Sequence, residues 1–368
     1  MSTVVLCCSQ GLNFERCCGK CCITGLYSSL IWLTDELDVE VIRGIINLRP
    51  QPQGCVVTLG NFDGVHRGHQ AVLAKVREKS KELGLPSVLV CFEPQPKEFF
   101  DEFNAPARLS RFREKIELLS LQGVDTVLCL RFNEATRSMS ATEFIGLLVE
   151  KLNTKALFVG DDARFGADRS GSYQSLLDAG RKFDFEVTNL RTLTFAETRV
   201  SSSRIRECLA LGDLEQAEEM LGYPYSIKGK VVYGRQLGRT LNAPTANVQL
   251  HRYRAPIDGV FAVEAWLGSE GNEKIIQGVA NVGVRPTLNE ASLKPILEVF
   301  LFDFKGNLYG QSIKVVFRSK LRNEKKFNGL DELKEAIAKD IKHAKKFFSD
   351  RSKDIATINS VTKSEQIE

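Results

Sequence analysis

A strand-like run, a glycine-rich turn and a helix-like run follow one another over residues 55–83 and constrain the fold more than any other stretch. The turn, residues 60–69, reads GNFDGVHRGH and carries two of the four histidines of the chain. Its glycines allow the backbone to come close to a ligand. The N–H groups that open the following helix attract anions, and imidazoles can donate to developing negative charge. The succession outlines a polyphosphate site, the alternative being histidines that are merely packed or solvated.

Strand-like and helix-like runs alternate from about residue 41 to residue 223. Strands are expected at residues 56–59, 87–92, 126–130, 156–159 and 186–190. Helices are expected between them, at residues 70–83, 109–121, 141–152 and 173–183. This alternation predicts a Rossmann-like α/β domain with a parallel sheet and right-handed crossovers. Ligands bind at the carboxyl ends of such strands, where residues 60–69 and 160–171 both fall.

Near residue 226 the pattern changes to short, alternating segments punctuated by glycine. Strands are expected at residues 229–233, 260–266, 275–282, 297–302 and 312–317. They predict a small antiparallel β-barrel, followed by an amphipathic helix over residues 330–348. The expected division is an N-terminal extension (1–40), an α/β domain (41–224), a barrel domain (225–350) and a flexible tail (351–368).

Composition narrows the class of protein. The chain has 368 residues, enough for two domains, and a net charge of +4, too small to indicate nucleic-acid binding. No apolar run reaches the ~18 residues of a membrane span. Six of the ten cysteines fall in the first 22 residues, and the other four lie in apolar contexts typical of a reducing compartment. We therefore expect a cytoplasmic protein without membrane or nucleic-acid partners.

Residues 1–40 do not resemble the rest of the chain. We expect a disordered extension or a misassigned start. The paired cysteines at residues 17–22 leave zinc binding as an alternative, although no nearby histidine supports it. A targeting peptide is a second alternative, against which the absence of Lys and Arg from the first 15 residues argues.

The histidine turn resembles the Gly-x-Phe-Asp-Gly-x-His-x-Gly-His signature of the bifunctional riboflavin kinase/FMN adenylyltransferase family, the prokaryotic FAD synthetases. The resemblance extends over about residues 41–348. It implies that His66 and His69 hold ATP phosphates. The other residues of the turn that it assigns to ATP are Gly60, Asn61, Phe62, Asp63, Gly64 and Gly68.

Residues 201–206, SSSRIR, resemble a second phosphate-binding run of that family, with Ser in place of Thr. The resemblance assigns phosphate binding to Ser202 and Ser203 and a catalytic role to Arg206. Hydroxyls followed by Arg at the start of a helix can bind pyrophosphate. A plain helix cap is the alternative for this run.

Two segments resemble flavin-binding parts of the family: residues 92–96 (FEPQP) and residues 160–171 (GDDARFGADRSG). The flavin-binding residues implied are Phe92, Pro94, Asp162, Phe165 and Arg169. Ala163 replaces a usual Phe, and Phe165 has a core position as its alternative. In adenylyl transfer the FMN phosphate is already an anion, so the site needs positioning and charge neutralisation but no general base.

The barrel carries a run that resembles the flavokinase signature. Residues 244–247, PTAN, are intact, and the resemblance implies that Thr245 and Asn247 bind Mg²⁺ and ATP phosphate. Gly229, Gly234 and Gly238 are the expected nucleotide-binding glycines. Asn242-Ala243 replaces Gly-Phe, from which we expect weakened or altered binding.

Further flavokinase-like segments are residues 278–287 and the Arg322-x-Glu324 run. They imply that Arg285, Arg322 and Glu324 lie near flavin. Phosphorylating a neutral ribityl hydroxyl requires removal of a proton, for which Glu298 is the candidate general base. A solvated strand position is the alternative for Glu298. Phe300 replaces a histidine often found there.

The resemblance implies two Mg²⁺-dependent reactions: riboflavin and ATP give FMN, then FMN and ATP give FAD and pyrophosphate. One alternative is that only one activity is competent. Another is a non-catalytic flavin-binding or RNA-binding protein. The sequence leaves the oligomeric state open.

Overall fold

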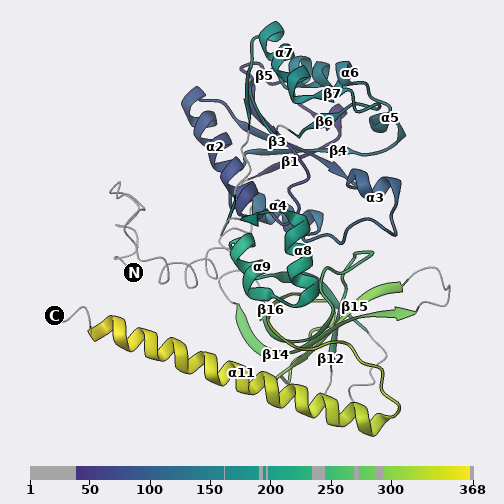
Figure 1. The fold of residues 1–368 in the computed structure, drawn as a ribbon, viewed down its shortest axis with the longest axis vertical. Coiled ribbons are helices and arrows are strands. Elements are labelled where there is room, and N and C mark those ends of the chain that lie inside the picture. Colours follow the sequence, from purple (N-terminus) through teal and green to yellow (C-terminus); the bar gives the residue numbers. More distant parts are fainter. Residues whose placement is uncertain are drawn as a thin grey trace.

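A sheet of parallel strands and a β-barrel make up the two halves of the molecule (Figure 1). The computed structural model describes residues 39–160, 162–189, 194–195, 198–233, 245–268, 273–286 and 293–364. The expected extension falls almost wholly outside these residues. Gly234, Gly238 and the Asn242-Ala243 pair also lie outside them.

The sheet of the first half has six parallel strands in the order β1-β4-β3-β2-β5-β8. Their bounds are β1 Glu40–Arg43, β2 Cys55–Leu59, β3 Ser87–Glu93, β4 Thr126–Arg131, β5 Thr154–Val159 and β8 Glu186–Asn189. Starting from β2, the chain adds β3 and β4 on one side of the sheet, and then adds β5 and β8 on the other side of β2. The switch point between β2 and β5 is where such sheets bind ligands. The histidine turn follows β2, and residues 160–171 follow β5.

Helices connect the strands of the sheet. They are α2 Arg67–Leu83, α3 Pro96–Phe100, α4 Phe112–Ser120, α5 Glu134–Arg137, α6 Ala141–Gly146 with a π-helical turn at Leu147–Lys151, and α7 Tyr173–Phe183. Two short antiparallel pairs, β6 Arg164–Phe165 with β7 Gly171–Ser172 and β9 Thr194–Phe195 with β10 Thr198–Arg199, complete this half. The parallel α/β prediction is confirmed.

Two differences from the sequence expectation have local causes. Helix α2 begins at Arg67 because the His66 side chain accepts the backbone N–H of His69 and caps the helix. Helix α4 begins at Phe112 because the backbone N–H groups of Leu109 and Ser110 bind a carboxylate elsewhere in the chain. Strand β1, a short edge strand that begins at Glu40 and ends at Arg43, was not expected from the sequence.

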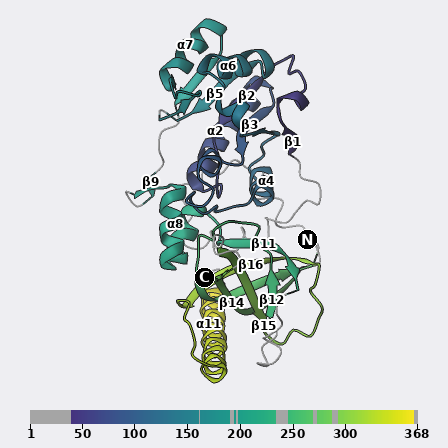
Figure 2. The ribbon, with the colours of Figure 1, turned by 90° about the vertical axis from the view of Figure 1, so that its right-hand side faces the viewer.

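The second half is a closed antiparallel barrel with strand order β11-β12-β15-β14-β13-β16, seen from the side in Figure 2. Its strands are β11 Ser226–Val232, β12 Thr245–Val248, β13 Gly259–Leu267, β14 Lys274–Pro286, β15 Leu293–Leu301 and β16 Ser312–Arg322. The barrel prediction is confirmed, with β12 as an additional short strand.

Two helices, α8 Ser202–Leu211 and α9 Leu214–Leu221, lie between the sheet and the barrel (Figure 1). Their apolar residues, among them Ile205 and Leu221, join one hydrophobic core with Phe261 and Phe317 of the barrel. These helices therefore share the hydrophobic core of the barrel.

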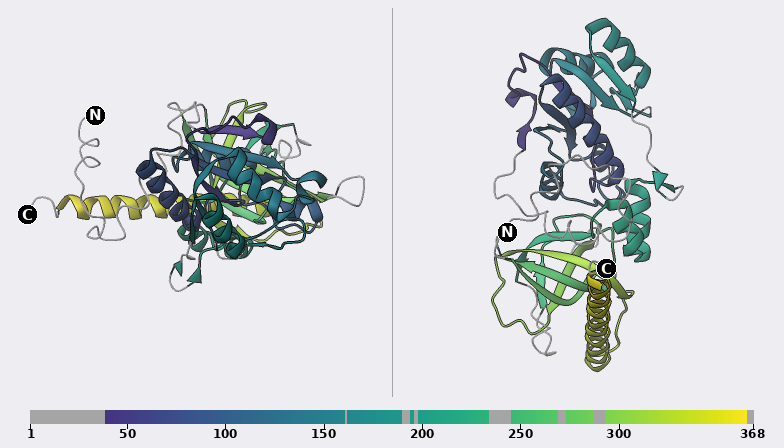
Figure 3. Two further views of the ribbon diagram at one scale, coloured as in Figure 1. Left: turned by 90° about the horizontal axis from the view of Figure 1, so that it is seen from above. Right: turned by 90° about the vertical axis from the view of Figure 1, so that its left-hand side faces the viewer.

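The last helix, α11 Leu330–Ser364, packs against β13, β14 and β16 through Ala344 and Phe348. It continues beyond residue 348, where the sequence analysis ended it, and projects from the barrel (Figure 3). Within the described part of the chain, no helix is long and apolar enough to span a membrane. Cys55, Cys91, Cys129 and Cys208 are buried free thiols.

Candidate active sites

His66 and His69 lie together at the junction between β2 and α2. The His66 side chain is buried, and its Nδ1 accepts the backbone N–H of His69 at 3.3 Å. Because Nδ1 is an acceptor, the geometry assigns the proton of the neutral ring to Nε2, which becomes a donor. The two rings stack with centroids 3.7 Å apart. The turn therefore presents a pair of oriented imidazoles.

Both imidazoles are neutral at pH 7. Burial lowers the pKa of His66 from 6.5 to about 4, although the nearby Asp63 carboxylate opposes the shift. Burial, then the neighbouring His66 and Lys115, hold the pKa of His69 well below its usual value. The Nδ1 atom of His69 is buried and has no hydrogen-bond partner in the described part of the protein. Such an atom is suited to a ligand, since buried polar groups are otherwise paired.

The backbone of the turn is unusual. Phe62 and Val65 have positive φ angles of 47° and 35°, which side-chain-bearing residues rarely adopt. A Cβ atom on Gly68 would lie 3.1 Å from the His66 ring. Strained backbone persists only where its surroundings hold it. The turn must therefore be anchored from outside.

Asp63 provides that anchor. Asp63 is only 3% exposed, and its carboxylate accepts the backbone N–H groups of Leu109 and Ser110, both at 3.0 Å. Arg206 Nη2 donates to the same carboxylate at 2.6 Å, and Ser202 Oγ donates to the Asp63 carbonyl at 3.1 Å. The structure thus brings together the two segments to which the sequence analysis assigned ATP phosphates. Asp63 faces protein donors rather than solvent.

The N-terminal end of α8 lies beside this anchor. Ser201 Oγ caps the helix by accepting the backbone N–H of Arg204 at 3.3 Å, and Ser203 is exposed. Arg206 also donates from Nε to the Ala107 carbonyl at 2.5 Å. The guanidinium is therefore held in place by two protein acceptors next to the turn.

Lys115 is a residue that the sequence analysis missed. The residue is 2% exposed, and its Nζ donates to the carbonyl of Asn61 at 3.1 Å. It places a buried cation directly behind the histidine turn. The sequence feature that could have indicated this role is a lysine within the apolar stripe of α4, between Phe112 and Ile116.

The residues expected to bind flavin in the first half lie at the ends of two strands. Phe92 lies near the end of β3. Its ring packs edge to face against Phe132, with ring centroids 5.7 Å apart. Pro94 lines a cavity of about 520 Å³ between the two halves of the molecule. In the wall of this cavity, Arg108 forms ion pairs with Glu93 and Glu98.

The segment after β5 contributes from the other side of β2. Phe165 is partly buried and packs against Phe144, with ring centroids 5.2 Å apart. The Phe165 ring is therefore also part of the packing of the hydrophobic core. Asp162 and Arg169 are exposed. Ala163 packs at the edge of the same core.

In the barrel, the strand register brings the kinase candidates together. Asn247 on β12 pairs with Glu298 on β15, which in turn pairs with Asn281 on β14. Thr245 pairs with Phe300 two residues further along. Because directly paired side chains share a face and residues i and i+2 do so too, all five lie on one face. Their neighbours Val248, Leu297 and Val299 fill the barrel core, so this face is the outer one.

Glu324 lies near Glu298. Burial raises the pKa of the Glu324 carboxyl, and the charges of Asp258 and Glu298 add to this, while Arg322 opposes it. A Cβ atom on Gly283 would overlap the Glu324 carboxylate. The site therefore includes two nearby carboxyl groups on the outer face of the barrel.

Two other kinase candidates hold the barrel together. Arg322 donates three hydrogen bonds of 2.8–3.1 Å to Asp340, which fixes α11 to the barrel. Gly229 allows β11 to approach the backbone of Gln249, where a Cβ atom would lie 2.4 Å from the carbonyl oxygen. The side chain of Arg285 is not among those described.

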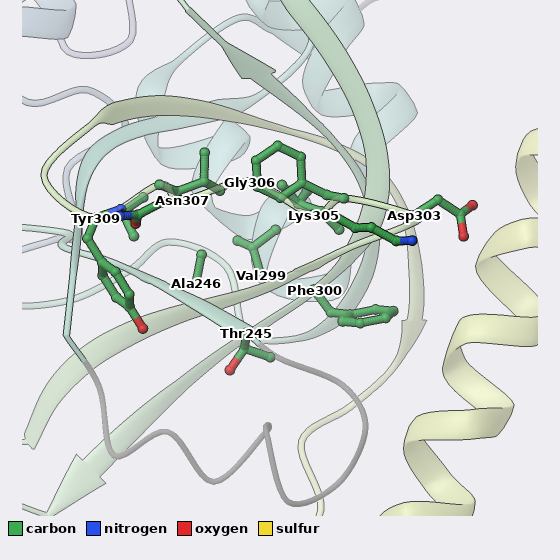
Figure 4. Close-up of a pocket in the computed structure, with 13 residues that line it drawn as sticks. Thr245, Ala246, Val299, Phe300, Asp303, Lys305, Gly306, Asn307 and Tyr309 are labelled. Atoms are coloured by element: carbon green, nitrogen blue, oxygen red, sulfur yellow. Dashed lines mark hydrogen bonds between the residues drawn. The ribbon is translucent and has the colours of Figure 1, made fainter.

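A cavity of about 310 Å³ opens beside Thr245 (Figure 4). Thr245 and Phe300 line it from paired strands, and Asn307 and Tyr309 line it from the loop that follows β15. The ring of Tyr309 stacks on Tyr233, with centroids 4.0 Å apart. Its size and mixed lining are those of a small-molecule site.

Both halves of the molecule are similar to known proteins. The FAD synthetase family model matches residues 48–204, and the riboflavin kinase family model matches residues 221–348. The bifunctional riboflavin kinase/FMN adenylyltransferase of Escherichia coli (strain K12) is 49% identical over 312 residues, covering 84% of this chain and 98% of that protein. The enzyme of that description from Pseudomonas fluorescens is 48% identical over 308 residues, covering 83% and 97%.

A solved structure has a similar fold over most of the chain. It is described as a macrolide-efflux protein from Streptococcus pneumoniae, has a TM-score of 0.68 and is 28% identical, covering 82% of this chain and 97% of that one. The family models and the curated relatives agree with the motifs in both halves. This chain belongs to the bifunctional riboflavin kinase/FMN adenylyltransferase family.

Proposed function

We propose that this chain makes FMN and FAD in two successive reactions. Riboflavin kinase activity converts riboflavin and ATP to FMN and ADP, and adenylyltransferase activity converts FMN and ATP to FAD and pyrophosphate. The observation that carries this function is identity of 49% to a bifunctional enzyme over 98% of its length. It is supported by two separate assemblies of polar residues, one in each half.

We assign the two reactions to different domains. Residues 41–224 carry adenylyl transfer, residues 225–350 carry riboflavin phosphorylation, and residues 1–40 and 351–368 take part in neither. The family matches to residues 48–204 and 221–348 support this division. We also propose that the protein works in the cytoplasm, because its substrates are ATP and a flavin.

In adenylyl transfer, a phosphate oxygen of FMN attacks the α-phosphorus of ATP. A phosphoanhydride bond forms, the bond to the β-phosphate breaks and pyrophosphate leaves, so no proton has to be removed. His66 Nε2 and His69 donate to the ATP phosphates, where charge builds up on the leaving group. Ser202, Ser203 and the start of α8 contribute further donors. Arg206 adds positive charge from its place beside Asp63.

In riboflavin phosphorylation, Glu298 removes the proton from the terminal ribityl hydroxyl. The resulting oxygen attacks the γ-phosphorus of ATP, and ADP leaves. The partly buried Glu298 side chain lies between Asn247 and Asn281 in the strand register, so it can face a hydroxyl held on that surface. The cavity beside Thr245 accommodates the nucleotide.

Thr245 and Asn247 fit a site for Mg²⁺ carried in by ATP. Their neutral side-chain oxygens lie two residues apart on β12, on one face. Mg²⁺ keeps several waters and takes one or two protein oxygens besides phosphate. When bound, it neutralises charge on the transferred phosphate. No group of three His, Cys, Asp or Glu in the described ranges forms a metal cage of the protein's own.

We propose that flavin occupies a different place in each reaction. In adenylyl transfer, Phe92, Pro94 and Phe165 contact the ring, with Asp162 and Arg169 near its edge. In phosphorylation, Arg285, Arg322 and Glu324 border the ring. Of the residues in the first placement, Pro94 lines the cavity of about 520 Å³.

A chromatographic time course of purified protein with riboflavin, ATP and Mg²⁺ tests the function. The proposal predicts FMN first and FAD after it. FMN without FAD would restrict the chain to the kinase reaction. FAD from supplied FMN, but no product from riboflavin, would place a defect in the barrel near Asn242-Ala243. Flavin or RNA binding without any product would favour a non-catalytic role.

A further inference from the structure

Residues 107–110 form a short segment held between the histidine turn and the barrel. On one side, the carboxylate of Asp63 accepts the N–H groups of Leu109 and Ser110 at 3.0 Å. On the other side, Nη1 of Arg252, from the barrel, lies 3.1 Å from the Arg108 carbonyl oxygen and 3.4 Å from that of Leu109. One arginine of the barrel thus contacts the segment that anchors the turn.

The two sets of contacts involve the same peptide groups. The peptide group joining Arg108 to Leu109 accepts from Arg252 through its carbonyl and donates to Asp63 through its N–H. The next peptide group, joining Leu109 to Ser110, repeats the pattern. Hydrogen bonds in series polarise one another, and the cation at one end favours the anion at the other. Two peptide groups therefore connect Arg252 to Asp63.

Arg252 is itself held firmly. Its side chain is 1% exposed, Nη2 donates to Glu114 at 2.5 Å, and Nη1 donates to the hydroxyl of Tyr225 at 2.9 Å. Glu114 also accepts the backbone N–H of Lys228, at 2.9 Å. A buried guanidinium with partners in both halves fixes position more strictly than a surface ion pair, because its planar fork sets the geometry.

We propose that Arg252, a residue of the kinase barrel, is a positioning residue for adenylyl transfer. It fixes residues 108–110, these fix Asp63, and Asp63 sets the strained turn that orients His66 and His69. This inference rests on the adenylyltransferase reaction proposed above. It follows that the adenylyltransferase site is complete only when the barrel is docked against it.

The test is a pair of steady-state assays on Arg252→Lys. Lysine keeps a positive charge, but its one ammonium group cannot stand both at the Nη2 position beside Glu114 and at the Nη1 position beside the two carbonyls and Tyr225. We expect kcat/KM for FAD formation from FMN and ATP to fall by about 10-fold to 100-fold, since small misplacements have effects of this order. FMN formation from riboflavin should keep its kcat and KM. Arg113→Ala, an exposed neighbour of Glu114 on α4, is the matched control and should leave both reactions unchanged.

A double-substitution cycle separates a path through Asp63 from a general effect. If Arg252 acts through Asp63, Arg252→Lys should change FAD formation by less than about 2-fold in an Asp63→Asn background, because coupled residues are not additive. Independent, multiplying effects of the two substitutions would overturn the inference. Equal losses in both reactions would also overturn it, because they would mean a destabilised protein.

Failure of this inference and failure of the proposed function give different results. Wild-type protein that forms FAD, together with an Arg252→Lys protein that forms it with unchanged kcat and KM, overturns the inference alone. Wild-type protein that forms no FAD from supplied FMN overturns the adenylyltransferase reaction, and the role of Arg252 falls with it.

Discussion

The imidazole rings of His66 and His69 lie face to face, with centroids 3.7 Å apart and planes inclined by 15°. The Phe62 ring lies on His69 at 4.7 Å. Two imidazolium cations would repel at this distance, and burial keeps both rings neutral by lowering their pKa values. The pair therefore offers fixed hydrogen-bond donors and acceptors within the histidine turn.

Replacing His69 with alanine should separate the two reactions. His69→Ala removes one donor to the leaving pyrophosphate, which typically lowers kcat by about 100-fold to 1,000-fold. FMN formation from riboflavin should remain at the wild-type rate, because Glu298 lies in the barrel. Both rates are measured by chromatography of the flavin products. His343→Ala, at an exposed position on α11, is the control, and a fall in both rates for His69→Ala would contradict separate sites.

Replacing Glu298 should have the opposite effect. Glu298→Gln keeps the shape of the side chain but removes the general base, so FMN formation should fall by about 100-fold to 10,000-fold. FAD formation from supplied FMN should be unaffected. Glu335→Gln, exposed on α11, serves as the matched control. Wild-type FMN formation by the Glu298→Gln protein would remove Glu298 from the mechanism.

A methyl group on Gly68 should disturb the site without weakening the fold. The Cβ atom of Gly68→Ala would press on the His66 ring from 3.1 Å, so we expect slower FAD formation. Alanine is a better helix former than glycine by about 1 kcal/mol, which offsets the local strain in stability. The measurements are the FAD-forming rate and the thermal midpoint. Gly329→Ala, where the methyl group meets nothing within 4 Å, should change neither rate; equal rates in both proteins would refute the contact.

The buried His66 should make the protein sensitive to mild acid. The pKa of His66 is about 4 in the folded protein and 6.5 in the unfolded chain. As the pH falls below 6.5, His66 is therefore protonated in the unfolded chain while it stays neutral in the folded protein, which favours unfolding. No effect is expected above pH 6.5, and the folded state should lose about 2 kcal/mol at pH 5 from this group.

Urea unfolding at pH 7 and pH 5 measures that loss. The free energy of unfolding of His66→Gln should fall less between the two pH values than that of the wild type. An equal fall in both proteins would mean that His66 is not neutral when buried.

The sequence predicted the order of elements because strand and helix periodicities differ and each run is long enough to show its own. The family resemblance assigns both residues 60–69 and residues 201–206 to phosphate, and the structure brings Ser202 and Arg206 against Asp63. Element ends were less predictable. The start of α4 depends on Asp63, which lies far away in sequence and takes the N–H groups of Leu109 and Ser110.

Lys115 and Arg252 could not be predicted as parts of a site from local pattern. Lys115 is a lysine within an apolar helix face, and only the fold shows that it reaches the Asn61 carbonyl. Arg252 lies in an irregular segment after β12 and gains its partners when the barrel meets α4. Both roles arise from contacts between distant segments, which a single sequence does not display.

The most direct test of two reactions at two sites is to mix two variants that each lack one of the two activities. His69→Ala alone, given riboflavin, ATP and Mg²⁺, should stop at FMN, and Glu298→Gln alone should make almost no product. The mixture should form FAD, because FMN released by the first protein is adenylylated by the second. Wild-type FAD formation by either variant alone, or none by the mixture, would contradict the account.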